Sequence, residues 1–207
     1  GVSVDANGVL SGSKFMVPDA AQATWIAVVG SDAAGDAVVA LVAGRDVAAQ
    51  AQASHALIDL TKRASTLDFT GVKAQRVLSG DKVASAIRDY LLIGALLTAA
   101  EAVGSISACL AGIVDYLKTR KQFGKLIGSF QALKHPTVDI YVGMEHSRSL
   151  VYHASSEIDD GPLSAEAEVA CRMAKAKASD TIQYAGDRSV QFHGGFGFTW
   201  ECDSSLF

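Results

Sequence analysis

One segment of the chain combines a guanidinium group, a glycine break and a polar helix start. It reads Arg-Lys-Gln-Phe-Gly-Lys-Leu-Ile-Gly-Ser-Phe-Gln-Ala-Leu-Lys-His over residues 120–135. Arginine stays charged and can donate two parallel hydrogen bonds to a phosphate, and the free N–H groups of a helix start attract anions. The segment therefore predicts a binding site for an anionic ligand at Arg120 and Gln131. A polar corner between helices, with Ser129 as a cap only, is the alternative.

A second segment could supply the other half of this binding site. It reads Gln-Phe-His-Gly-Gly-Phe-Gly-Phe over residues 191–198 and follows a helical pattern. A glycine at a helix end is commonly a simple stop. Gly194, Gly195 and Gly197 are more glycines than a stop requires, and glycine lets the backbone approach a flat or phosphorylated ligand closely. Phe196, Phe198 and Trp200 are interpreted as packing residues.

The elements that must position these segments change in character near residue 78. Before it, short valine-rich runs separated by turn residues predict strands of a small antiparallel sheet or barrel. After it, the apolar period becomes helical and predicts three long helices in an antiparallel bundle. The fold class is therefore α+β. The expected strands cover residues 2–5, 15–17, 26–29, 37–42 and 66–70, and the expected helices cover residues 81–120, 130–158 and 164–194.

Local signals mark the ends of these helices. Gly124 and Gly128 break the first helical pattern, and Ser129 is the expected N-cap of the second helix. Pro136 falls near the second turn of that helix, where we expect a distortion. Ser164 is the expected N-cap of the third helix, which has Glu166 and Glu168 in its first turn.

Composition excludes several classes of function. The 207 residues are 49% hydrophobic and carry a net charge of -4 without a basic run, which argues against nucleic-acid binding. Three widely spaced cysteines and no signal-peptide pattern favour the cytoplasm. Residues 91–114 are apolar enough for a membrane span, but Glu101 lies near their middle, so we expect a buried bundle helix. His146 and His153 are seven residues apart, which does not suit a metal pair, and no metal site is expected.

Taken together, the two glycine segments resemble the acyl-CoA dehydrogenase family. Arg120 to Gly124 with Gln131 is similar to that family's R-x-x-F-G…Q segment, and residues 191–198 resemble its Q-x-x-G-G-x-G segment in the histidine-bearing form. Residues 10–18, Leu-Ser-Gly-Ser-Lys-Phe-Met-Val-Pro, resemble its L-x-G-x-K-x-W-I-T strand. The resemblance implies that residues 1–77 are part of the middle β-domain and residues 78–207 the C-terminal helical domain, which binds FAD and forms oligomers.

The resemblance also implies a flavoprotein that is a homo- or heterotetramer, with an acyl-CoA substrate and an electron-transfer flavoprotein as electron acceptor. The glycine segment would contact an FAD shared with the neighbouring subunit, and the strand at residues 16–18 would flank the flavin ring. Pro18 lacks the hydroxyl group that the family's threonine offers to the flavin. The implied FAD contacts are Arg120, Phe123, Gln131, Gln191, Phe192, His193, Gly194, Gly195, Met16, Val17 and Pro18.

The implied reaction is α,β-dehydrogenation of an acyl-CoA thioester, in which a carboxylate removes the α-proton. The family places this base either beyond the glycine segment, past Phe207, or on the first long helix at the position of Gly94. A substrate-holding arginine of the family falls on Ala95. Glu101 is interpreted as a buried structural carboxylate and Glu201 as a surface residue. A catalytically silent subunit of a heteromeric dehydrogenase and a structural bundle without cofactor remain as alternatives.

Overall fold

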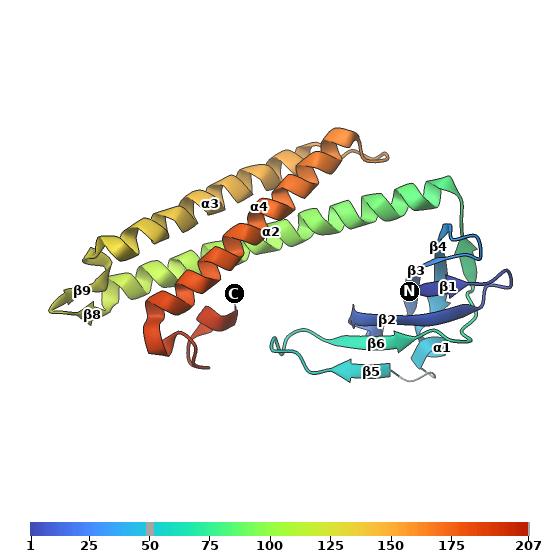
Figure 1. Cartoon of the computed structure of the whole chain (residues 1–207), viewed down its shortest axis with the longest axis horizontal. Coiled ribbons are helices and arrows are strands. Elements are labelled where there is room, and N and C mark those ends of the chain that lie inside the picture. The colour runs from blue at the N-terminus through green and yellow to red at the C-terminus, as the bar shows by residue number, and fades with distance from the viewer. Residues whose placement is uncertain (49–51, 207) are drawn as a thin grey trace. The chain divides into compact units, whose positions relative to one another are not determined.

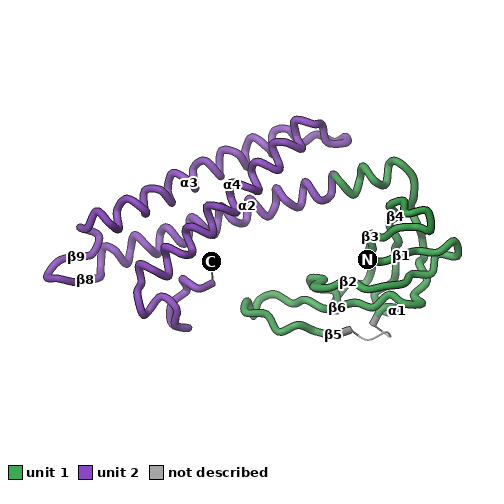
Figure 2. Tube along the Cα trace, viewed as in Figure 1, with its two compact units in different colours: residues 1–88 green, residues 89–207 purple. Residues whose placement is uncertain are grey.

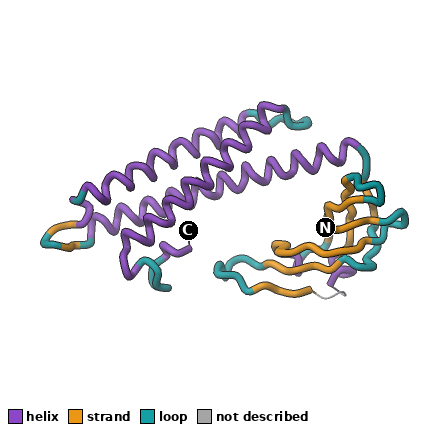
Figure 3. Tube along the Cα trace, in the orientation of Figure 1, coloured by secondary structure: helices purple, strands orange, loops and turns teal. Residues whose placement is uncertain are grey.

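The computed structural model describes residues 1–48 and 52–206. The chain forms two compact units, residues 1–88 and 89–207 (Figure 2). The first unit is built mainly from strands and the second from helices, as Figure 3 shows. Helix α2 (Asp81–Thr119) runs through the boundary between the two units. The expected order of a β-rich part followed by a helical part is confirmed.

The first unit contains a mixed sheet in which the strand order is β5-β6-β2-β1-β3-β4-β7. Every neighbouring pair of strands is antiparallel except β1 and β3, which are parallel at Ser3 and Ser31. The purely antiparallel sheet expected from the sequence is wrong at this one pair, and β5 and β7 were not expected. The strands are β1 (Val2–Val4), β2 (Leu10–Pro18), β3 (Trp25–Ser31), β4 (Ala37–Ala43), β5 (Gln52–His55), β6 (Ala64–Asp68) and β7 (Arg76–Leu78).

Alternation along the strands directs one set of side chains into a common core. In β4, Val38, Ala40 and Val42 are buried, and the residues between them are partly exposed, as the two-residue period of a strand requires. These side chains join Leu10, Leu67 and other apolar residues in one cluster. Short helices α1 (Gly44–Ala48) and η1 (Ala20–Gln22) and the first residues of α2 also belong to this unit.

The second unit contains most of α2 and the whole of α3 and α4, the long helices of the chain (Figure 1). A two-stranded hairpin, β8 (Lys121–Gln122) and β9 (Lys125–Leu126), joins the first helix to the second and was not expected. The helices are α2 (Asp81–Thr119), α3 (Gln131–Ser156) and α4 (Ala165–His193), and the short helices are η2 (Ile127–Ser129), η3 (Gly194–Phe196) and η4 (Asp203–Leu206). The three expected helices are therefore present, with ends within a few residues of the expected ones.

The two expected serine caps have different outcomes. The Ser164 side chain accepts a hydrogen bond from the backbone N–H of Ala167 at 3.0 Å, so Ser164 is the N-cap of α4. Ser129 as the N-cap of α3 is wrong. Its hydroxyl donates to the carbonyl of Leu126 at 2.7 Å, and the capping position is taken by Phe130 without a side-chain cap.

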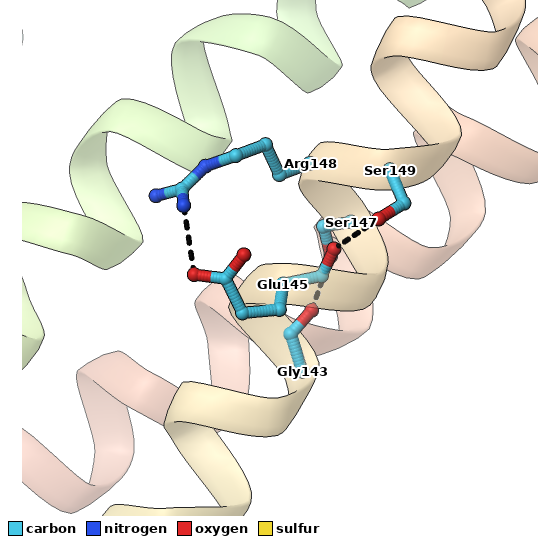
Figure 4. Close-up of polar contacts among 5 residues, drawn as sticks. All are labelled: Gly143, Glu145, Ser147, Arg148 and Ser149. Carbon is cyan, nitrogen blue, oxygen red and sulfur yellow. Dashed lines mark hydrogen bonds and ion pairs between the residues drawn. The ribbon is translucent and has the colours of Figure 1, made fainter.

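Helices α3 and α4 pack closely where α3 has small side chains. Gly143, Ser147 and Ala154 of α3 are buried, and Ser147 Oγ donates to the carbonyl of Gly143 at 2.8 Å. Figure 4 shows this bond together with the ion pair between the partly buried side chains of Arg148 and Glu145, which are 2.7 Å apart. Near its start, α3 continues through Pro136 as one unbroken helix.

Helix α2 has one buried face and a large exposed apolar surface. By length and composition, α2 could cross a membrane, and it is the one helix of the described residues that meets this test. Its most apolar 18 residues have a mean hydropathy of 1.7. Only 22% of that window is buried in this chain. Leu92, Leu96 and Ile106 face the core, whereas Leu91 and Leu97 are exposed. The expectation of a buried helix therefore holds for one face only.

Candidate functional site

A cavity of about 680 Å³ lies in the second unit, where the hairpin, the start of α3 and the end of α4 meet. Both glycine segments identified in the sequence contribute to its wall. The lining residues are Tyr116, Arg120, Gln122, Phe123, Ile127, Phe130, Ala132, Leu133, Phe192, His193, Gly194, Gly195 and Phe196. The structure therefore brings Arg120, Phe123 and the segment Phe192–Gly195 together in one cavity, and the sequence predicted that the two segments form one binding site.

The hairpin fixes the position of Arg120 at the end of α2. The backbone N–H of Arg120 bonds to the carbonyl of Tyr116 at 2.9 Å, and its carbonyl accepts from Ile127 at 2.9 Å. The two turn residues, Phe123 and Gly124, both have positive φ, 53° and 77°, as a tight two-residue hairpin turn requires. Glycine tolerates this conformation, but phenylalanine rarely adopts it, and such outliers cluster at functional sites.

The cavity wall carries a cation that has no counter-ion in the described part of the chain. Arg120 is exposed and forms none of the ion pairs of these residues. Beside it, Phe123 packs edge-to-face on Phe130 at 6.1 Å, and Lys125 lies 4.6 Å from the centre of the Phe130 ring. A positive charge next to aromatic rings suits a ligand that has both an anionic group and a flat ring.

The glycines at the end of α4 have different local roles. Gly194 has φ of 61° and ends the helix, and Gly197 is so close to the carbonyl of Val190 that no side chain fits. Gly195 has neither constraint, since its φ is not positive and a Cβ atom there would meet nothing within 4 Å. The end of the helix therefore does not require a glycine at position 195. The backbone of Gly195 lies in the cavity wall with open space beside it.

Two predicted contact residues do not line the cavity. Gln131 and Gln191 are both exposed, and neither is among the lining residues. Conversely, sequence reasoning missed Tyr116. It lies one helical turn before Arg120, so that helical spacing could have placed the two side chains on one face. Tyr116 also stacks on His193, with ring centres 4.3 Å apart.

The third predicted segment lies in the first unit. Met16, Val17 and Pro18 line a separate cavity of about 300 Å³ together with Phe15, Phe69 and residues 26–29. The pairing of β2 with β6 shifts register between Lys14 and Val17, and Met16 within this irregularity has φ of 55°. A bulge that re-aims side chains is common next to functional sites.

Neither Gly94 nor the two glutamates considered in the sequence offers a buried carboxylate in the described residues. A Cβ atom at Gly94 would meet nothing within 4 Å, so this position is open space in the described residues. Glu101 is exposed, which corrects its interpretation as a buried structural carboxylate, and Glu201 is exposed as expected. Within residues 1–48 and 52–206, no group of three or more His, Cys, Asp or Glu side chains could hold a metal ion.

Two buried thiols of the second unit, Cys109 and Cys171, have a shifted pKa. Burial raises the pKa of Cys109, and a hydrogen bond with Ser189 opposes this rise. Burial also raises the pKa of Cys171. Cys109 Sγ donates to the carbonyl of Ala185 at 3.3 Å and thereby links α2 to α4. These thiols are structural, since a buried neutral thiol is a poor nucleophile.

Residues 84–207 match the family described as acyl-CoA dehydrogenase, C-terminal domain. The chain therefore belongs to the acyl-CoA dehydrogenase family. It is 39% identical over 113 residues to acyl-CoA dehydrogenase IpdE2 of Mycolicibacterium smegmatis, covering 55% of this chain and 34% of that protein. It is 34% identical over 148 residues to the short-chain-specific acyl-CoA dehydrogenase of Megasphaera elsdenii, covering 68% of this chain and 37% of that protein.

Solved structures show the same fold over nearly the whole chain. A glutaryl-coenzyme A dehydrogenase in complex with glutaryl-CoA superposes with a TM-score of 0.85 at 25% identity, covering 99% of this chain and 54% of that one. Butyryl-CoA dehydrogenase from Megasphaera elsdenii gives a TM-score of 0.81 at 26% identity, covering 99% and 55%. The chain thus spans about a third of its curated relatives and just over half of these structures.

Proposed function

We propose that the protein binds FAD through the cavity at Arg120 and takes part in the α,β-dehydrogenation of an acyl-CoA thioester. The observation that carries this proposal is the shared cavity, in which an arginine without a counter-ion lies with an unconstrained glycine backbone at Gly195. Membership of the acyl-CoA dehydrogenase family supports the reaction class.

The residues present fit the cofactor. The Arg120 guanidinium would bind the pyrophosphate, since it can donate two hydrogen bonds to phosphate oxygens. The bare backbone at Gly194 and Gly195 would lie against the cofactor, and Phe123 and Phe130 would exclude water from one side of the cavity. Met16 to Pro18 line a separate cavity of the first unit and are proposed as flavin contacts on the resemblance alone. When bound, FAD supplies the redox chemistry by accepting the hydride.

We also propose that the protein is an oligomer, a homo- or heterotetramer, in which the cofactor is shared between subunits. Support comes from aromatic side chains of the second unit that the chain leaves in solvent, with Phe123, Phe198 and Trp200 exposed to 89%, 73% and 81%. Large exposed apolar side chains commonly mark interfaces. Light scattering behind a sizing column would test this, and a monomer that retains FAD would contradict the shared site.

A second candidate function is a catalytically silent subunit of a heteromeric dehydrogenase. Gly94 favours it, because the position of one family base has no side chain and open space around it. The structures similar to this chain include a Tcur3481–Tcur3483 steroid acyl-CoA dehydrogenase variant at 26% identity and a ChsE4–ChsE5 complex from Mycobacterium tuberculosis at 25% identity. Such a subunit would hold part of a cofactor site and depend on its partner for the base.

Anaerobic mixing with acyl-CoA thioesters of graded chain length separates the two candidates. An active dehydrogenase is expected to lose its visible flavin absorbance, because the hydride of the substrate reduces the flavin. A silent subunit would keep its flavin colour alone and lose it only as a complex with its partner chain. Loss of colour by this chain alone would contradict the silent role.

An electron-transfer flavoprotein is the proposed electron acceptor. The relatives include the CarC subunit of a caffeyl-CoA reductase-Etf complex from Acetobacterium woodii, at 35% identity. Reoxidation of the reduced protein by a purified electron-transfer flavoprotein, followed by flavin absorbance, would test this. We propose the cytoplasm as its location, which agrees with three buried free cysteines.

A further inference from the structure

The imidazole ring of His193 is held on one side by the end of α4. Its Nδ1 atom lies 2.8 Å from the carbonyl oxygen of Ser189, one turn earlier, and 3.1 Å from the hydroxyl of Ser204 in η4. Its ring packs on Tyr116 at 4.3 Å between centres and lies 6.4 Å from the Phe196 ring. The orientation of the ring is therefore fixed by contacts on several sides.

These contacts determine which ring nitrogen carries the proton. A carbonyl oxygen only accepts hydrogen bonds, so a contact of 2.8 Å requires a hydrogen on Nδ1. In neutral histidine the other nitrogen, Nε2, then has a free lone pair and is an acceptor. The second-unit residues thus select one tautomer of His193.

Three buried side chains on the Nδ1 side of His193 form hydrogen bonds with one another. Ser189 Oγ donates to Ser204 Oγ at 2.9 Å, and Cys202 Sγ donates to Ser204 Oγ at 3.1 Å. Ser189, Ser204 and Cys202 are 2%, 5% and 6% exposed. Because Nδ1 points at this buried group, the opposite edge of the ring, with Nε2, points away from it. His193 itself is partly exposed and lines the 680 Å³ cavity.

We propose that the Nε2 atom of His193, left as an acceptor by the hydrogen bond of Nδ1 to Ser189, accepts a hydrogen bond from a hydroxyl group of bound FAD. This inference rests on the proposed FAD site. Arg120 on the same wall supplies the charge for a phosphate, and Nε2 supplies an acceptor, which a phosphate cannot use but a ribityl or ribose hydroxyl can. The cavity therefore selects a ligand that carries hydroxyl groups next to phosphate.

The tautomer can be measured without any ligand. Nitrogen-15 NMR of the histidine rings at about pH 8, above the usual histidine pKa, distinguishes a protonated from a lone-pair nitrogen. We expect His193 to show hydrogen on Nδ1 and a lone pair on Nε2, with the signal assigned by its loss in His193→Gln. A hydrogen on Nε2 would overturn the proposal. Addition of FAD should move the Nε2 resonance toward that of a hydrogen-bonded acceptor.

Two variants separate the two nitrogens. The amide of His193→Asn can replace the Nδ1 donor to Ser189 but does not reach the Nε2 position, whereas His193→Gln reaches the Nε2 position. We expect His193→Asn to weaken FAD binding about tenfold, since one hydrogen bond is lost, and His193→Gln to stay within about threefold. Unchanged binding in His193→Asn would contradict the acceptor role.

Failure of this inference differs from failure of the FAD proposal. If the unaltered protein binds no FAD in the same titration, the proposed function is wrong and the acceptor role falls with it. If the protein binds FAD but the Nε2 resonance does not move, only the role of His193 is overturned.

Discussion

Gly143 of α3 lies so close to Thr181 of α4 that a Cβ atom at position 143 would be 2.8 Å from Thr181 Cγ2. The bare backbone of Gly143 lets α3 approach α4 at this point. The same two helices carry Leu133, near the start of α3, and Phe192, near the end of α4. Both of these residues line the cavity.

We expect Gly143→Ala to destabilise the protein by about 1–2 kcal/mol. Overpacking costs about 1–3 kcal/mol, and the better helix propensity of alanine offsets up to about 1 kcal/mol. Urea unfolding measures the change. Thr181→Ser removes Cγ2 and should restore most of the loss in the double variant. A double variant as unstable as the sum of both single ones would contradict the steric account.

The two serines at helix starts should respond differently to alanine. Ser164→Ala removes the cap of α4 and is expected to cost about 1 kcal/mol. Ser129→Ala is the matched control, because its hydroxyl bonds to Leu126 and caps no helix, so we expect a loss of under about 0.5 kcal/mol. Equal losses in thermal unfolding would show that the capping geometry is not as described.

Gly195→Ala should weaken the binding of FAD without unfolding the protein. The backbone at Gly195 has no positive φ, and the added methyl group meets no protein atom within 4 Å. The methyl group would occupy the space in which FAD is proposed to contact the backbone of Gly195. We therefore expect at least a tenfold loss of FAD affinity and an unchanged melting temperature of the apoprotein. Unchanged affinity would place the cofactor away from Gly195.

The buried thiol of Cys109 should make the protein less stable at alkaline pH. Burial raises its pKa above the ordinary value of 9.0, so the folded state holds the proton longer than the unfolded state does. The resulting stability is fully present below pH 9.0 and is lost as pH rises through the raised value. The free energy of unfolding, measured between about pH 8 and 10, should fall less steeply with rising pH in Cys109→Ala than in the unaltered protein. Parallel curves would contradict the raised pKa.

The elements that were predictable from the sequence are those with strong local signals. Ser164 precedes two glutamates and a helical pattern, and its cap is found as expected. Ser129 carries the same type of side chain, but it lies in the short helix η2, and its hydroxyl bonds to Leu126 instead of capping α3. The hairpin β8–β9 was missed because each of its strands has only two residues.

The site was predictable where it depends on residue chemistry and less so where it depends on packing. Arg120 and Gly195 were predicted from the chemistry of a guanidinium and of extra glycines, and both line the same cavity. Gln131 and Gln191 were expected as contacts from the resemblance, and the structure leaves both exposed and outside the cavity wall. Tyr116 and Ser204 were missed because their proximity to His193 arises only when α2, α4 and η4 come together.

The central claim is that the Arg120 cavity holds FAD, and its most direct measurement is the FAD affinity of Arg120→Ala. Titration followed by flavin absorbance should show tight binding by the unaltered protein and a loss of at least tenfold in Arg120→Ala, because the phosphate loses a charged partner. Arg172→Ala, which removes an exposed arginine paired with Glu168 on α4, should bind normally. Equal affinity in Arg120→Ala and Arg172→Ala would contradict the account.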